Sequence, residues 1–226
     1  METVMLRAGD GPEFVGHVAM PEGAPKGAIV VLHEAFGVTP HIKRVCEDFA
    51  GQGYAVVAPA MLALGLGKPE GAVLPQHKDG LEEARRLIGL TDQDQLLALV
   101  EACVQWGRDQ GLKVGVTGYC WGGSVAYTAA SKLNIDAAVC YYGGQIQDIC
   151  KVMQPKCPSL VHLAKLDRYI PVEDAVEALK TYDTTSEVHV YNADHGFNRD
   201  DGVTYDAGAA LVARRLTLDL FLKFVN

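Results

Sequence analysis

The chain has 226 residues, of which 49% are hydrophobic, and its 20 Lys and Arg against 28 Asp and Glu give a formal net charge of −8. A chain of this length can bury most of its surface, and we expect a single domain over residues 1–226. The acidic balance and the lack of a basic run argue against nucleic acid or an anionic membrane surface as a partner.

The sequence shows no apolar signal-peptide core and no run of 18 apolar residues. Its six cysteines are widely spaced and include no C-x-x-C, which argues against a disulfide framework and a zinc site. We therefore expect a cytoplasmic protein that acts on a small molecule without a cofactor or metal. We expect no nucleic-acid or membrane partner, and a monomer is the working hypothesis for its assembly.

The first half of the chain predicts a lead-in hairpin followed by buried strands and helices. Turn residues separate two short strands, and the later apolar, β-branched runs are typical of strands buried on both faces. Thr39 is a plausible N-cap, with Pro40 as the first helical residue. Residues 59–91 are the least regular, and we expect them to pass over the active-site face. The predicted strands are 3–7, 14–20, 28–33 and 54–58, and the predicted helices are 40–51, 81–90 and 92–110.

The second half of the chain alternates strands with helices, which predicts βαβ units. We therefore expect an α/β fold with a mostly parallel sheet and helices on both faces. Binding sites in such sheets form outside the carboxyl ends of the strands. Residues 113–131 are predicted to open as a strand and to end as a helix. The other predicted strands are 136–142, 159–164 and 187–191, and the other predicted helices are 146–153, 171–182 and 204–224.

A strand-turn-helix pattern at residues 113–131 contains Gly118-Tyr119-Cys120-Trp121-Gly122. The spacing matches the G-x-S-x-G nucleophile elbow, with Cys in place of Ser. Glycines around a strained central residue let neighbouring backbone approach closely. The N-terminus of the following helix favours a thiolate at Cys120. The alternative is that Cys120 is an inert core cysteine beside a tight turn.

Three further reactive residues follow predicted strands, namely Glu34, Asp167 and His195. The order nucleophile, acid, histidine is that of α/β-hydrolases. His195 can take the thiol proton of Cys120, while Asp167 can accept the other ring N–H and orient the imidazole. The predicted oxyanion donors are the backbone N–H groups of Trp121 and Ala35.

Other interpretations of these residues remain open. Asp194 is a rival acid, but adjacent residues cannot easily both aim at one imidazole, so Asp167 ranks above it. Glu34 could be a surface or salt-bridged loop residue, and His162 and His189 are interpreted as structural or surface residues. The dipeptide His33-Glu34 does not indicate zinc, because Gly37 stands where H-E-x-x-H needs a second His.

Five motifs together resemble the dienelactone hydrolase family, the carboxymethylenebutenolidases. They are HEAFGV at 33–38, GYCWGG at 118–123, CYYGG at 140–144, LDRYIP at 166–171 and DHGFNR at 194–199. The resemblance implies an α/β-hydrolase fold with Cys120, Asp167 and His195 as catalytic triad. It also implies that Glu34 holds the resting thiol until an anionic substrate displaces it. The implied reaction converts dienelactone to maleylacetate through a thiol acyl-enzyme, a step in chloroaromatic breakdown.

The resemblance further implies two arginines that bind the substrate carboxylate. Arg199 matches one, whereas the other position falls on Leu81, and Arg85 and Arg86 lie one helical turn further on. Phe36, in the first motif, is also a candidate substrate-binding residue.

We expect a cysteine-dependent hydrolase of a small anionic lactone or ester. One alternative is a general short-chain carboxylesterase or thioesterase. The other is a non-catalytic binding or redox-sensing protein that keeps the reactive thiol.

Overall fold

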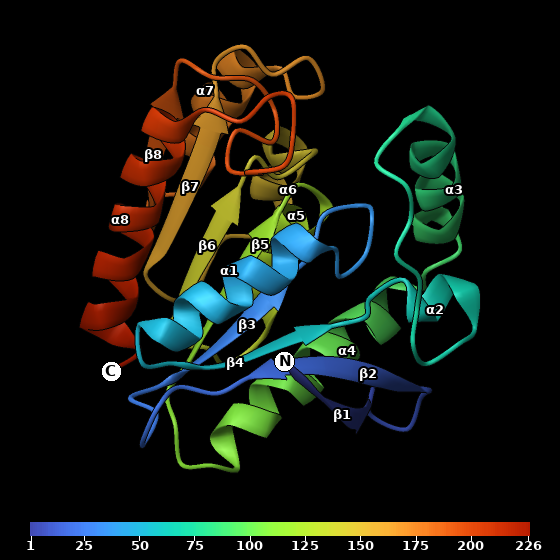
Figure 1. The fold of residues 1–226 in the computed structure, drawn as a ribbon. Coiled ribbons are helices and arrows are strands. Elements are labelled where there is room, and N and C mark those ends of the chain that lie inside the picture. The colour runs from blue at the N-terminus through green and yellow to red at the C-terminus, as the bar shows by residue number, and fades with distance from the viewer. The chain divides into compact units, whose positions relative to one another are not determined.

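The computed structural model describes residues 1–226, and its contacts form two compact units, Met1–Val114 and Gly115–Asn226. Each unit combines strands and helices, labelled as in Figure 1. The strands are β1 (Glu2–Arg7), β2 (Glu13–Ala19), β3 (Ala28–Leu32), β4 (Ala55–Pro59), β5 (Val114–Tyr119), β6 (Ala137–Tyr141), β7 (Ser159–Ala164) and β8 (Ser186–Tyr191). The helices are α1 (Pro40–Gly51), α2 (Ala63–Leu66), α3 (Lys78–Gly89), α4 (Gln93–Arg108), α5 (Trp121–Lys132), α6 (Ile146–Val152), α7 (Val172–Tyr182) and α8 (Ala207–Phe224).

In the first unit the strands lie in the order β1-β2-β4-β3. β1 and β2 form the predicted antiparallel hairpin, β2 is antiparallel to β4, and β3 is parallel to β4. Every residue of β3 and β4 is buried, as their apolar runs predict. The helices α1 and α4 both contact these two strands, and Figure 1 shows α1 in front of them and α4 behind.

Residues 59–91 contain more regular structure than the sequence predicts. The short helix α2 packs against α3. At Gly65 a Cβ atom would lie 2.1 Å from the carbonyl oxygen of Leu87, so only glycine allows this approach. The helix α3 begins at Lys78, three residues before the predicted start, and its N-cap residue His77 makes no side-chain capping bond. Without a capping signal the sequence pattern places this boundary too late.

In the second unit β5, β6, β7 and β8 lie in chain order and are all parallel, as predicted. Side chains alternate between the two faces of a strand. On one face, the Tyr141 side chain of β6 bonds Thr217 of α8. On the other face, the sulfur of the preceding residue, Cys140, lies beside Gly143. Gly143 in turn lies close to the backbone N of Ser124 in α5. The helices α5 and α8 therefore cover opposite faces of these strands.

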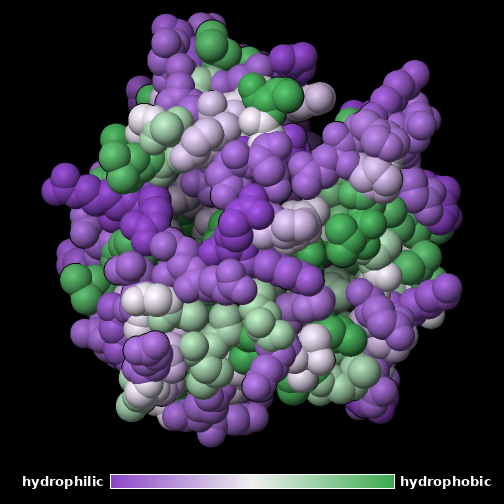
Figure 2. Space-filling model, in the orientation of Figure 1, coloured by the Kyte–Doolittle hydropathy of each residue, from purple (hydrophilic) through white to green (hydrophobic).

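The helix α8 begins at Ala207, three residues after its predicted start at 204. Its start is set by Asp206, whose side chain accepts a hydrogen bond from the backbone N–H of Ala209 at 2.8 Å. No helix of the structure combines the length and apolar character needed to cross a membrane. Figure 2 shows hydrophilic residues over most of the face in view, with hydrophobic residues in separate patches.

Candidate active site

The predicted elbow lies where β5 ends and α5 begins. Its central residue, Cys120, has φ 54° and ψ −117°, a strained conformation for a residue with a Cβ atom. The backbone N–H of Cys120 donates a hydrogen bond to the carbonyl of Tyr141 at 3.0 Å, which fixes the turn to β6. Cys120 is partly exposed, whereas the other five cysteines are buried. The turn therefore gives this thiol, unlike the other five, access to solvent.

Close backbone approaches explain the glycines around Cys120. A Cβ atom at Gly118 would lie 1.9 Å from the carbonyl oxygen of Gly122. At Gly123 it would lie 2.6 Å from the carbonyl oxygen of Tyr141. The fold thus requires glycine two residues before and three residues after the predicted nucleophile.

The side chain of Asp167 lies just past the end of β7 and is completely buried. Its Oδ1 accepts hydrogen bonds from the backbone N–H groups of Tyr169 at 2.8 Å and Ile170 at 3.2 Å. Its Oδ2 lies 2.6 Å from Nδ1 of His195. The turn after β7 therefore holds this carboxylate in one orientation, with its second oxygen available to the imidazole.

His195 lies in the loop after β8 and is hydrogen-bonded to both Asp167 and Cys120. Burial lowers the pKa of His195, but its hydrogen bonds and electrostatic interactions with Asp167 and Cys120 outweigh burial and raise the pKa to about 10. The rings of Tyr142 and Tyr169 pack around the imidazole, with centroids 5.0 Å and 5.1 Å from it. His195 is thus a strong proton acceptor held between a thiol and a carboxylate.

Asp194, the rival acid, does not bond the imidazole. Its Oδ1 accepts the backbone N–H of His195 at 2.7 Å, and its Oδ2 lies 2.9 Å from a guanidinium nitrogen of Arg168. Of the two carboxylates, Asp167 bonds the imidazole, and its role as the catalytic acid stays a prediction.

The loop that carries Glu34, Ala35 and Phe36 is fixed within the first unit. Nε2 of the buried His33 accepts the backbone N–H of Met61 at 3.1 Å, so Nδ1 carries the proton and donates to the carbonyl of Glu34. Gly37 has φ +86°, and a Cβ atom there would lie 1.9 Å from the carbonyl oxygen of Ala72. Glu34 and Ala35 are both buried, and their catalytic roles stay predictions.

The arginines predicted to bind a carboxylate differ in their surroundings. Arg199 is mostly buried in the loop after His195, with Nε 3.7 Å from Oδ1 of Asp201. Arg86 makes two 2.7 Å hydrogen bonds to Glu83 on the surface of α3, so these donors are engaged within the helix. Arg85 is exposed on the same helix. Arg199 is therefore the stronger candidate of the three.

Tyr142, Tyr169 and Arg168 were not selected from the sequence as site residues. Tyr142 has φ 37°, an unusual value for an aromatic residue, at the end of the CYYGG motif's strand. Tyr169 and Arg168 adjoin Asp167 in the LDRYIP motif. The sequence signal for these three residues is that they lie in the CYYGG and LDRYIP motifs.

The histidines His162 and His189 lie outside this arrangement. His162 is fully buried and bonds Thr217 and Tyr191, and His189 bonds Glu187 at the surface. No group of three or more His, Cys, Asp or Glu side chains has an arrangement that could hold a metal ion.

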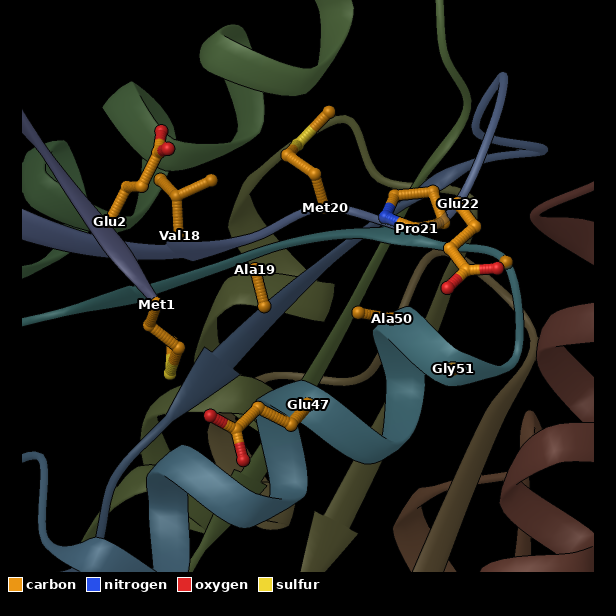
Figure 3. Close-up of a pocket in the computed structure, with 11 residues that line it drawn as sticks. Met1, Glu2, Val18, Ala19, Met20, Pro21, Glu22, Glu47, Ala50 and Gly51 are labelled. Atoms are coloured by element: carbon orange, nitrogen blue, oxygen red, sulfur yellow. The ribbon is translucent and has the colours of Figure 1, made fainter.

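A hollow of about 830 Å³ lies in the first unit, between β2 and the end of α1 (Figure 3). Apolar side chains such as Met20 and Ala50 line it together with the carboxylates of Glu2, Glu22 and Glu47. It contains none of the predicted site residues and offers neither a thiol nor an imidazole.

The chain is similar to known proteins along almost its whole length. The model of the dienelactone hydrolase family matches residues 14–225. The carboxymethylenebutenolidase of Pseudomonas putida is 32% identical over 225 residues, covering 96% of this chain and 94% of the relative. A crystal structure from Klebsiella pneumoniae subsp. pneumoniae MGH 78578 has a TM-score of 0.83 at 26% identity and covers 99% of both chains. An alpha-beta serine hydrolase homologue from Coxiella burnetii shares the fold, with a TM-score of 0.66 at 14% identity and 96% coverage of both chains. The chain thus has an α/β-hydrolase fold and belongs to the dienelactone hydrolase family of ester and lactone hydrolases.

Proposed function

We propose that the chain is a cysteine-dependent hydrolase that cleaves small anionic lactones or esters, of the dienelactone type, through a thiol acyl-enzyme. The observation that carries the proposal is the hydrogen-bonded series of Asp167, His195 and Cys120, with the thiol on a strained turn at the start of α5. Acyl transfer requires a nucleophile, a base that takes its proton, and an acid that orients the base.

The first half of the reaction forms the acyl-enzyme. His195 takes the proton of the Cys120 thiol, and the thiolate sulfur bonds to the carbonyl carbon of the substrate. The backbone N–H of Trp121, the first residue of α5, stabilises the oxyanion. When the C–O bond breaks, the leaving alkoxide or enolate receives the proton from His195, and a thioester remains on Cys120.

The second half of the reaction hydrolyses the thioester. His195, oriented by Asp167, takes a proton from water, and the resulting hydroxide attacks the thioester carbonyl. Breaking of the C–S bond releases the product acid, which ionises to the carboxylate in water, and His195 returns its proton to the Cys120 thiolate. The two halves together consume one water molecule and require no metal or redox cofactor.

The anionic substrate class depends on Arg199. This mostly buried guanidinium lies four residues after His195 and is supported by Gly202, where a Cβ atom would lie 2.5 Å from Nε. A buried guanidinium is well suited to a carboxylate. We expect R199A to lose activity on anionic substrates and to keep most activity on neutral esters. Equal losses on both would exclude the carboxylate-binding role.

The proposal is tested by the loss of dienelactone absorbance with wild type and with C120A. A control variant, C157A, removes a buried cysteine of the same unit that takes no part in the proposed chemistry. Turnover by wild type and C157A with none by C120A supports both nucleophile and substrate class. Turnover that survives in C120A would refute the cysteine mechanism.

A general short-chain esterase or thioesterase is the second candidate. Leu81 at the position of a family arginine and the pairing of Arg86 with Glu83 favour it, because both weaken the case for a second carboxylate-binding group. Hydrolysis of p-nitrophenyl acetate in the absence of dienelactone turnover, with both lost in C120A, would select this candidate.

A further inference from the structure

The two loops that carry Asp167 and His195 are joined by successive links beyond the ends of β7 and β8. The backbone N–H of Lys165 donates to the carbonyl of Tyr191 at 2.7 Å, and that of Leu166 donates to the carbonyl of Ala193 at 2.9 Å. The next residue, Asp167, bonds His195 through its side chain at 2.6 Å. The strand pairing thus continues into the site.

The outermost link is the ion pair of Arg168 with Asp194, at 2.9 Å. Each partner is the immediate neighbour of a triad residue, Arg168 of Asp167 and Asp194 of His195. The second oxygen of Asp194 accepts the backbone N–H of His195 at 2.7 Å. Asp194 therefore holds the backbone of the histidine with one oxygen and the loop of the acid with the other.

We propose that Arg168 and Asp194 are positioning residues that clamp the acid loop to the histidine loop and keep His195 aligned with Cys120. The proposal rests on the function proposed above. Beyond the backbone hydrogen bonds of Lys165 and Leu166, the side chains of Asp167 and His195 hold the two loops together. The clamp is needed because this hydrogen bond must persist while the imidazole gains and loses a proton. A small misplacement of a catalytic group is costly for the rate.

The clamp is also electrostatically balanced. Asp167, the Cys120 thiol and Asp194 bring negative or ionisable groups to His195, the rings of Tyr142 and Tyr169 pack on it, and Arg168 compensates the charge of Asp194. Removal of Arg168 leaves an uncompensated anion beside the imidazole, and removal of the Asp194 charge leaves an uncompensated cation. The two changes should therefore shift proton binding at the site in opposite directions.

The test compares R168Q, D194N, their double variant and R168K in hydrolysis of p-nitrophenyl acetate. D194N keeps an oxygen that can accept the His195 N–H, so it removes the charge and spares the local turn. The control is K151Q, which breaks the exposed 3.0 Å pair of Lys151 with Asp148 in the same unit. We expect R168Q and D194N each to lower kcat about threefold to tenfold with KM nearly unchanged. The kcat of the double variant should be no lower than that of the single variant with the larger loss. The kcat of R168K should lie between those of R168Q and wild type.

A second readout is the pH dependence of Cys120 alkylation by iodoacetamide, which needs no substrate. The profile should move to higher pH in R168Q and to lower pH in D194N, a pattern that a merely structural role would not produce. Single variants within about twofold of wild type in kcat, with unmoved profiles, would overturn the clamp. If wild-type turnover does not depend on Cys120, the proposed function fails. The alkylation profiles need no turnover, so they still test whether Arg168 and Asp194 act on the site.

Discussion

Nε2 of His162 lies 3.2 Å from Oγ1 of Thr217, in the buried interior between β7 and α8. The Thr217 hydroxyl donates to the carbonyl of Ala213 at 2.9 Å, so it accepts from the Tyr141 hydroxyl at 2.7 Å and from the N–H of His162. Nδ1 of His162 in turn lies 3.0 Å from the Tyr191 hydroxyl, which must donate to it. One threonine thus satisfies polar groups of two strands.

Replacement of Thr217 by valine should destabilise the protein. The shape is kept, but Tyr141 and His162 lose a buried acceptor, and we expect a loss of about 2–3 kcal/mol in the free energy of unfolding. Urea unfolding of T217V measures it, with T217S as the control because serine keeps the hydroxyl. A T217V stability equal to that of T217S would show that the hydroxyl is not needed.

The two fully buried histidines should make the protein sensitive to mild acid. Burial lowers the pKa of His33 to about 4 and that of His162 to about 3. Unfolded histidine has a pKa of about 6.5, so the unfolded state binds protons first as the pH falls. This stability is fully present above about pH 6.5 and is lost as the pH falls towards the folded values, by roughly 1.4 kcal/mol per pH unit for each histidine.

Urea unfolding at several pH values between about 7 and 5 measures this slope. H162Q should have a smaller slope than wild type because one of the two buried histidines is gone. The control is H77Q, since His77 is exposed and makes no capping bond, and its slope should equal that of wild type. An unchanged slope in H162Q would contradict the assignment of a neutral buried imidazole.

The sequence predicts the strands of this fold well because buried parallel strands have runs of apolar, β-branched residues, as in β3 and β7. Its errors lie at helix starts and in residues 59–91. The start of α8 depends on the Asp206 side chain, and α2 has only four residues held by close packing at Gly65. Such boundaries follow from individual hydrogen bonds and contacts, which hydrophobic periodicity does not encode.

Asp167 and His195 could be selected from the sequence because each follows a predicted strand, and parallel strands bring their carboxyl ends together. The roles of Asp194 and Arg168 could not be predicted from the sequence, because their pairing depends on how two loops that are 26 residues apart in the chain lie beside each other. For the same reason the packing of Tyr142 and Tyr169 on His195 emerges only from the structure.

Replacement of Asp167 by asparagine should disable the base. The hydrogen bond and charge of Asp167 contribute to the raised pKa of His195, so D167N should lower that pKa and misorient the ring. We expect kcat to fall by at least about a hundredfold. Alkylation of Cys120 by iodoacetamide near neutral pH should also slow, because the thiolate loses its imidazolium partner. D174N, at an exposed position of α7, is the control, and equal alkylation rates in the two variants would refute the dependence.

Glu34 should restrain the resting thiol if the role implied by the family resemblance holds in this chain. A carboxylate near a thiol disfavours the thiolate by like-charge repulsion. E34Q removes the charge and preserves the size of the side chain, so alkylation of Cys120 near neutral pH should become about threefold to tenfold faster. E47Q, which neutralises an exposed carboxylate of α1, controls for the change in net charge. If E34Q and E47Q are alkylated at the wild-type rate, the restraint is absent and the buried Glu34 serves its own loop instead. If E34Q alone is faster, the thiol is kept neutral at rest, and an anionic substrate that displaces this carboxylate would itself trigger the nucleophile.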